Sequence, residues 1–126
     1  MSFLPLKDQT YLQSRGLQFE LVEWSGQKAV IFRGYGLPKD RFNVAIADVL
    51  VLLPPGYPDG PPDMFFTHPW IRLAGTGGWP KAADNPFQFN NINWQRWSRH
   101  NTEWRRGKDG IWTMLKRIDH ALEVAQ

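Results

Sequence analysis

The stretch that decides the fold is Leu53–Trp70, LPPGYPDGPPDMFFTHPW, which holds six prolines in eighteen residues. Each proline fixes its own φ and restricts the residue before it, so the segment is expected to follow one extended, turned path. It comes directly after the apolar run VLVLL at 49–53, which favours a buried strand. A short strand is expected at Asp63–Thr67. The pattern therefore predicts a rigid bend that joins two strands.

Upstream of this bend, the sequence predicts one helix and three strands. Pro5–Arg15 has a proline suited to a first turn and is followed by Gly16, which suits a helix end. Alternating or β-branched apolar residues predict strands at Leu17–Trp24, Lys28–Arg33 and Asn43–Leu53. We expect a turn at Ser25-Gly26 and a loop at Gly34–Phe42. With Asp63–Thr67, these strands would form a four-stranded antiparallel meander.

Downstream of the bend, the spacing of apolar residues first predicts no regular element and then predicts a helix. Glycines and a proline interrupt Ile71–Gly107, so this stretch is predicted to be mostly irregular. Apolar residues at helical spacing predict a last helix at Gly110–Val124, with Asp109 as its cap. There is no repeat or linker, and residues 1–126 are predicted to form a single α+β domain.

Composition excludes several kinds of site. The 126 residues include no cysteine, which rules out disulfides, thiolate metal sites and thiol nucleophiles in this chain. The three histidines match no zinc spacing, and GTGG at 75–78 lacks the lysine of a phosphate loop, so we expect neither metal nor cofactor. The amino end lacks a signal-peptide pattern and no apolar run could span a bilayer. These features favour a soluble, cytoplasmic protein with no membrane partner.

The order of motifs in the bend resembles that of the ubiquitin-conjugating enzyme (UBC) superfamily. That family has a YP-x-x-PP turn, a short aromatic strand and an H-P-N tripeptide, and the matching residues here are Tyr57, Pro58, Pro61, Pro62, His68 and Pro69. The resemblance covers about Pro5–Leu122 and is most specific at Val49–Pro69. It implies a UBC-like fold, with an amino-terminal helix, a four-stranded antiparallel meander, a long irregular segment and a carboxy-terminal helix. The six motif residues would have structural roles.

The carboxy-terminal half is similar to a bacterial branch of this superfamily. NWQRWSRH at 93–100, followed by WRRGKDG at 104–110, resembles the pattern of prokaryotic family E. Members of that family occur with bacterial activating enzymes, ubiquitin-like modifiers and JAB-type peptidases. The resemblance therefore implies a ubiquitin-like protein, its activating enzyme, or both, as partners.

The sequence departs from the superfamily where the chemistry would occur. Family enzymes carry the modifier as a thioester on a cysteine shortly after the tripeptide, but Ile71–Pro80, IRLAGTGGWP, has no thiol. Trp70 stands where the family has asparagine. Thr76 offers the only hydroxyl in this window, and a hydroxyl needs a nearby base to act as a nucleophile. Thr76 and His100, the latter as an acid or base, are the candidate catalytic residues; a non-catalytic protein is the preferred interpretation.

A second constellation lies in the Trp- and Arg-rich segment 94–108. The candidate binding residues are Trp94, Arg96, Trp97, Arg99, His100, Arg105 and Arg106. Interfaces favour tryptophan and arginine, and two arginines beside a histidine can bind a carboxylate such as the tail of a ubiquitin-like modifier. If the segment were helical, the two tryptophans would share a face. The alternative is structural, with the tryptophans closing the core and the arginines solvated.

Three functions remain open from the sequence. The leading hypothesis is a cysteine-less UBC-like protein of a bacterial ubiquitin-like modification pathway, which binds the modifier or its activating enzyme. The second is a transfer enzyme that uses a hydroxyl or a histidine instead of a thiol. The third is a nucleic-acid-binding module that uses segment 94–108, and it is disfavoured because Glu103 and Asp109 interrupt the basic cluster.

Overall fold

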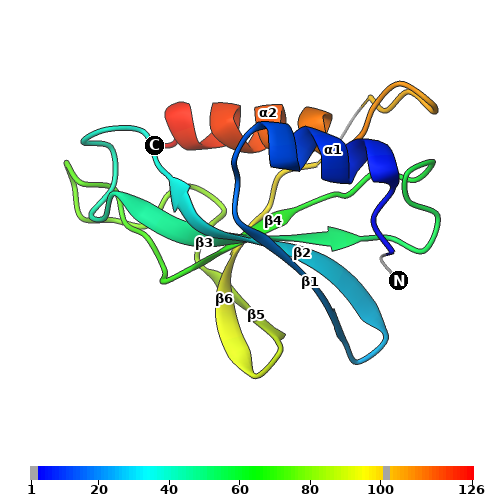
Figure 1. Cartoon of the computed structure of the whole chain (residues 1–126). Helices are drawn as coiled ribbons and strands as arrows, with labels where there is room; N and C mark the ends of the chain where they lie inside the picture. The colour runs from blue at the N-terminus through cyan, green and yellow to red at the C-terminus, as the bar shows by residue number, and fades with distance from the viewer. Residues whose placement is uncertain (1–2, 101–102) are drawn as a thin grey trace.

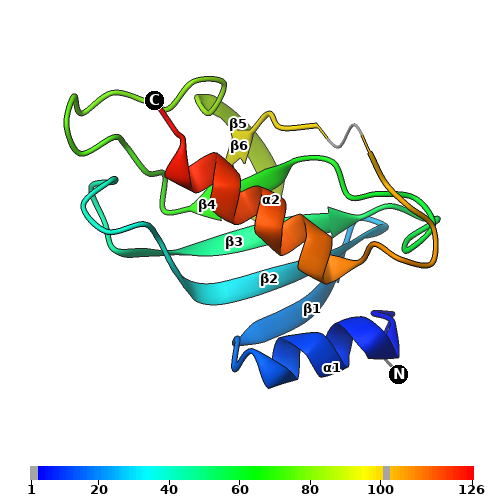
Figure 2. The same ribbon diagram turned by 90° about the horizontal axis from the view of Figure 1, so that it is seen from above.

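The computed structural model describes residues 3–100 and 103–126, and within them it forms two helices and one antiparallel sheet. The elements are α1 (Leu6–Ser14), β1 (Phe19–Trp24), β2 (Gln27–Gly36), β3 (Ile46–Leu53), β4 (Phe65–His68), β5 (Asn85–Phe89), β6 (Ile92–Trp97) and α2 (Ile111–Glu123). The strand order in the sheet is β1-β2-β3-β4-β6-β5. Both helices lie on the same face of the sheet (Figure 1). Seen from above, α2 crosses the middle strands and α1 lies beside β1 (Figure 2).

The α+β class and the first half of the topology agree with the sequence. Strands β1 to β4 pair consecutively, each antiparallel to the next. The two-residue turn between β1 and β2 has positive φ at both Ser25 and Gly26, the geometry that lets a tight hairpin match the strand twist. Gly16, with φ of 67°, follows the end of α1 as expected. The proline-rich bend joins β3 to β4.

The predicted four-stranded sheet is too small, because the predicted irregular segment contains a hairpin. Strands β5 and β6 pair with each other, and β6 pairs with β4. Asn90 and Asn91 have φ of 53° and 64°, so they form the two-residue turn of this hairpin. Asparagine tolerates this left-handed backbone better than most residues. The sequence Asn-Asn between two apolar runs was the signal for these strands.

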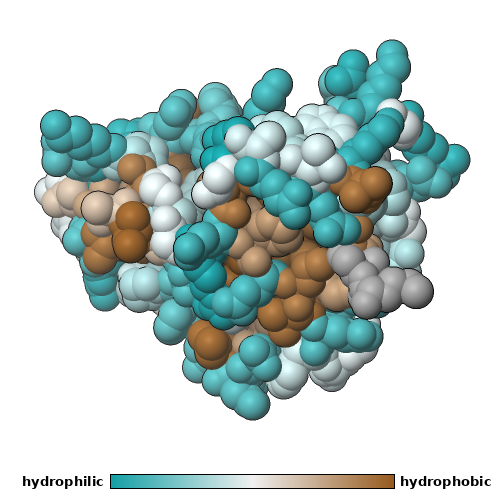
Figure 3. Space-filling model, viewed as in Figure 1, coloured by the Kyte–Doolittle hydropathy of each residue, from teal (hydrophilic) through white to brown (hydrophobic). Residues whose placement is uncertain are grey.

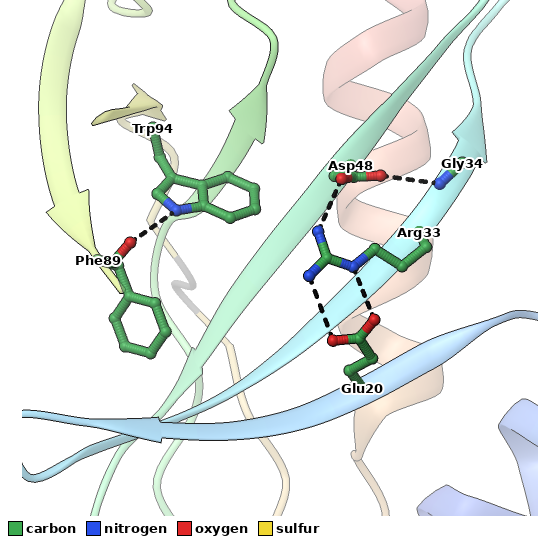
Figure 4. Close-up of polar contacts among 6 residues, drawn as sticks. All are labelled: Glu20, Arg33, Gly34, Asp48, Phe89 and Trp94. Carbon is green, nitrogen blue, oxygen red and sulfur yellow. Dashed lines mark hydrogen bonds and ion pairs between the residues drawn. The ribbon is translucent and has the colours of Figure 1, made fainter. Parts of the chain in front are cut away.

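A smaller correction concerns β2, which continues for three residues into the segment predicted as a loop, Gly34–Phe42. Gly34 has a φ of 62° and lies at an irregularity in the pairing of β2 with β3. Its N–H donates to Asp48 Oδ1 at 3.0 Å, and Arg33 Nη1 donates to Asp48 Oδ2 at 2.8 Å (Figure 4). Arg33 also pairs with Glu20 on β1. Asp48 therefore stabilises the irregular backbone, and β3 begins at Ile46 instead of Asn43.

The sheet separates two apolar clusters. The larger one lies under α2, whose buried residues are Ile111, Met114, Leu115, Ile118, Ala121 and Leu122. The smaller one lies on the opposite side, which we call the open face, and contains Ala29, Ile31, Leu50, Phe66, Phe89 and Trp94. Successive side chains of a strand point to opposite faces, so Trp97 joins the first cluster and Trp94 the second. On the open face, Trp94 Nε1 donates to the Phe89 carbonyl (Figure 4).

A buried carboxylate joins α1, the bend and α2. Asp8 is 1% exposed; its Oδ2 accepts the Tyr57 hydroxyl at 2.5 Å and its Oδ1 accepts the Ile111 N–H at 3.4 Å. Burial raises the pKa of Asp8, although both hydrogen bonds oppose this shift. Asp109, the predicted cap, lies one residue before the N-cap and instead binds the Arg105 N–H and the Thr113 hydroxyl. The first turn of α2 is thus capped from α1, by a residue distant in sequence.

Candidate functional site

The loop after the bend is held to the sheet by a buried glutamine. Gln95 Oε1 accepts the Ile71 N–H at 2.8 Å, and Gln95 Nε2 donates to the carbonyls of Ile71 at 3.0 Å and Ala83 at 2.8 Å. Gln95 Oε1 also accepts the Thr67 hydroxyl at 2.8 Å. Both Gln95 and Ile71 are fully buried. The start of the loop is therefore fixed from the helix-covered face of the sheet.

The remainder of the loop carries an ordered aromatic and cationic surface. The Arg72 guanidinium lies 3.8 Å from the ring centre of Trp79, and that ring meets Trp70 edge-on at 5.5 Å. Arg72 N–H donates to Asn43 Oδ1 at 2.8 Å, while the Asn43 N–H donates to the Arg72 carbonyl at 3.0 Å. Trp79 is 37% exposed. Trp70, which stands where the family has asparagine, therefore belongs to this stack, and nothing in the sequence connects it to Trp79.

Thr76 lies in the exposed turn of this loop. Its Oγ1 accepts the Gly78 N–H at 3.2 Å, and Gly77 N–H donates to the Leu73 carbonyl at 2.8 Å. Among the described residues, no imidazole or carboxylate hydrogen-bonds the Thr76 hydroxyl. A hydroxyl in that setting keeps its ordinary, weak nucleophilicity.

An open groove of about 490 Å³ lies between α2, the beginning of β4 and the residues that follow β6. Some of its lining side chains are apolar: Phe65, Met114, Ala121 and Val124. Basic and titratable side chains also line it: Arg99, His100, Lys116, Arg117 and His120. We call it the α2 groove. An apolar floor beside several cations suits an extended peptide that ends in a carboxylate.

His100 and Asp63 form a pair at the edge of the α2 groove. His100 Nδ1 lies 3.0 Å from Asp63 Oδ2, and the two side chains are 63% and 54% exposed. Arg99 Nη2 donates to the Lys81 carbonyl at 3.1 Å, and its guanidinium lies 5.3 Å from the ring centre of Trp97. Partial burial lowers the pKa of Arg99, which still carries its charge at neutral pH. His100 and Thr76 thus have different partners.

The structure divides the predicted binding residues among several places. Trp94 and Trp97 are both 0% exposed and lie on opposite faces of the sheet, so neither is available to a partner at the surface. Arg96 lines a pocket on the open face. Arg105 pairs with Asp109 at 3.3 Å. Only Arg99 and His100 of the predicted set line the α2 groove.

The motif residues of the bend have structural contacts. Tyr57 binds Asp8, and burial raises the pKa of the Tyr57 hydroxyl, which therefore stays a donor at neutral pH. The Trp104 indole donates to the Pro58 carbonyl at 2.8 Å. His68 ends β4 with its ring centre 5.7 Å from that of Trp94. The peptide bonds before Pro58 and Pro69 are cis.

Several groove residues could not be identified from sequence. Asp63 lies 37 positions from His100, and no motif connects the two. Lys116, Arg117 and His120 lie on α2, and no spacing in the sequence indicates the groove that they line. Among the described residues, no three histidine, aspartate or glutamate side chains are grouped to hold a metal ion.

A comparison with protein-family models matches residues 4–125 to the family described as Prokaryotic E2 family E. Neither the curated proteins nor the solved structures contain a significant match. Within the described residues, neither helix is long and apolar enough to cross a bilayer.

Proposed function

The chain belongs to Prokaryotic E2 family E, and from this premise we propose that it binds a ubiquitin-like modifier without forming a covalent bond to it. The extended carboxy-terminal tail of the modifier would lie in the α2 groove. Its terminal carboxylate would pair with the basic rim, and its side chains would contact the apolar floor. The observation that carries this proposal is a groove lined by both apolar and cationic side chains.

Two features favour recognition over transfer. The chain has no cysteine, and the Thr76 hydroxyl is bound within its own turn. An oxyester at Thr76 would need a base to take the hydroxyl proton, and the His100 imidazole is paired with Asp63 instead. The nucleic-acid alternative loses two of the three tryptophans in segment 94–108 as stacking platforms, because Trp94 and Trp97 are buried.

Titration with the cognate ubiquitin-like modifier tests the proposal. Amide signals of Lys116 and His120 in ¹⁵N NMR spectra should shift saturably on adding the modifier, and should not shift with a modifier that lacks its carboxy-terminal tail. A denaturing gel of the mixture should show no adduct. The proposal fails if the modifier does not bind.

A matched pair of charge reversals locates the site. Lys116 lines the α2 groove, whereas Lys108 is equally a surface lysine but does not line it. Lys116→Glu should weaken binding by roughly tenfold, because it reverses a charge that lines the groove. Lys108→Glu changes the net charge equally but outside the groove, so its effect should be much smaller. Equal weakening by the two variants would indicate long-range attraction instead of a bound tail.

The transfer alternative has a different signature. A thiol-resistant, hydroxylamine-sensitive adduct that disappears in Thr76→Ala would establish an oxyester and would overturn noncovalent binding as the function. Binding of the activating enzyme alone, with no effect of Lys116→Glu, would place the partner elsewhere on the surface.

A further inference from the structure

A second hollow of the described structure lies on the open face and shares only Asp63 with the α2 groove. It has a volume of about 730 Å³, and we call it the open-face pocket. Four strands from β3 to β6 contribute Leu52, Phe66, Phe87 and Arg96 to its lining, and Met64, just before β4, and Lys28 of β2 also line it. In Figure 1, the β1–β2 and β5–β6 hairpins extend away from the helices. Figure 3, from the same side, shows apolar surface between hydrophilic side chains.

The apolar wall of this pocket is built from stacked rings. Phe66 and Phe87 lie with ring centres 4.4 Å apart and 25° between their planes. Phe66 is 3% exposed, whereas Phe87, Met64 and Leu52 are only partly buried. These partly buried side chains leave apolar surface that an incoming side chain can cover.

Arg96 places an unsatisfied donor beside this wall. Nε of Arg41, Arg96 and Arg117 is buried without a partner among the described residues, and of these three only Arg96 lines the open-face pocket. The Arg96 guanidinium forms no ion pair with a described residue. A buried donor without an acceptor costs free energy. A carboxylate would satisfy it and can bond two guanidinium N–H groups at once.

The charges around the pocket favour an anionic ligand. Lys28 adds a second cation at its edge, and Asp63, the only acid among the described lining residues, already pairs with His100 at 3.0 Å. Two cations are too few for a nucleic-acid track, which needs a continuous basic groove with exposed rings. A volume near 730 Å³ instead suits a few residues of peptide.

We propose that the open-face pocket docks an acidic peptide segment of a protein partner, with a carboxylate bound to Arg96 and an adjacent apolar side chain against Phe66 and Phe87. This site shares only Asp63 with the α2 groove and does not depend on the tail binding proposed above. The protein would therefore present two docking sites, one on each face of its sheet.

Two matched peptides test this on the unaltered protein. The probes are Ac-Gly-Glu-Phe-Leu-Glu-Gly-NH₂ and the same peptide with both glutamates replaced by glutamine. The acidic peptide should saturably shift the backbone amides of Met64, Phe66 and Phe87 and the Arg96 Nε–H signal in ¹⁵N NMR spectra. The glutamine peptide should bind roughly tenfold more weakly or less, since hydrogen bonds to charged groups are the stronger ones. No saturable shift, or equal affinity for the two peptides, overturns the proposal.

A variant pair assigns the carboxylate to one arginine. Arg96→Gln should lower affinity for the acidic peptide by roughly tenfold and leave the glutamine peptide unaffected. Arg106→Gln removes the same charge from an exposed position outside the pocket and should change neither. If Arg96→Gln does not fold, the two peptides on the unaltered protein still decide. Persisting preference for the acidic peptide in a folded Arg96→Gln overturns the assignment.

Other occupants give distinct results that also overturn the proposal. A second copy of the chain would produce the same amide shifts on raising protein concentration, with a dimer in sedimentation. A short poly-dT strand that shifts these amides and binds more tightly than the acidic peptide would indicate nucleic acid instead.

Discussion

The two faces of the sheet differ in whether a buried polar side chain finds hydrogen-bond partners. Strand β6 contributes one such residue to each face. On the helix-covered face, Gln95 makes four hydrogen bonds that tie the loop after the bend to the sheet. On the open face, the next residue, Arg96, has a buried Nε with no partner among the described residues. Alternation along a strand sends these neighbours to opposite sides.

This difference helps to separate structural from binding roles. A polar side chain whose hydrogen bonds are satisfied inside the protein stabilises the fold, and removing it leaves its partners unsatisfied. A buried donor without a partner destabilises the free protein and gains an acceptor only when a ligand binds. The comparison therefore predicts opposite signs for stability changes at positions 95 and 96.

The largest effect is expected from Gln95→Leu. The substitution keeps an apolar body but removes the partners of the Ile71 N–H, of the Ile71 and Ala83 carbonyls and of the Thr67 hydroxyl. Each buried group left unsatisfied costs about 1–3 kcal/mol, so the free energy of unfolding should fall by about 3 kcal/mol or more. Urea denaturation followed by tryptophan fluorescence measures it.

Gln88→Leu is the matched control for this substitution. Gln88 lies in the neighbouring strand β5 and is exposed. It should change the free energy of unfolding by less than about 0.5 kcal/mol, as surface substitutions usually do. Similar losses at the two positions would mean that the buried hydrogen bonds do not distinguish the helix-covered face.

A smaller, pH-dependent effect is expected at Asp8, the other buried polar centre on the helix-covered side. Its pKa in the folded protein is raised above the ordinary 3.8, mainly by burial. The folded state therefore binds this proton more readily than the unfolded state. The stabilisation is complete below pH 3.8 and is lost as the pH rises through the folded-state pKa.

Asp8→Asn removes this titration while keeping an oxygen acceptor for the Ile111 N–H. The free energy of unfolding of the unaltered protein should decrease relative to that of the variant as pH rises from about 3.5 to about 7. Urea titrations of both proteins at each pH give the difference. A difference that is constant, or that changes in the other direction, contradicts a raised pKa.

Local patterns in the sequence were sufficient for much of the fold. The Ser25-Gly26 turn, Gly16 and the prolines of the bend act through their own backbone preferences, which are visible one residue at a time. The apolar spacing of α2 likewise needs no knowledge of its neighbours. These features predicted the helices, the meander of β1 to β4 and the family.

The remaining features depend on contacts that are distant in sequence. The cap of α2 comes from Asp8, which lies 103 positions before Ile111. The α2 groove brings His100 and Asp63, which are 37 positions apart, together beside a helix. The β5–β6 hairpin is a different case, because its Asn90-Asn91 turn is a local signal. The surrounding glycines led to the prediction of an irregular segment instead. Because side chains alternate along a strand, predicting a strand at Ile92–Trp97 would have placed its two tryptophans on opposite faces of the sheet.

Substitution of Arg96 should change the free energy of unfolding in the opposite direction to Gln95→Leu and stabilise the protein. Arg96→Met replaces an unsatisfied buried donor by an apolar side chain of similar length beside Phe66 and Phe87. The free energy of unfolding should rise by up to about 1 kcal/mol, because the substitution removes a buried donor that has no acceptor among the described residues. Urea denaturation measures the change, and Arg106→Met, at an exposed position, controls for the lost charge. A loss of more than about 1 kcal/mol would show that Arg96 supports the fold.

The smallest change in the free energy of unfolding is expected from His100→Ala. This substitution removes one member of a polar pair that is exposed to solvent. Both side chains of the His100–Asp63 pair are more than half exposed, and exposed ion pairs contribute little. The free energy of unfolding should change by less than about 0.5 kcal/mol, measured in urea at neutral pH. A larger loss would extend the structural role of the helix-covered face to the edge of the α2 groove. An unchanged stability together with weaker binding of the modifier tail would instead assign His100 to recognition, as the exposure of its ring implies.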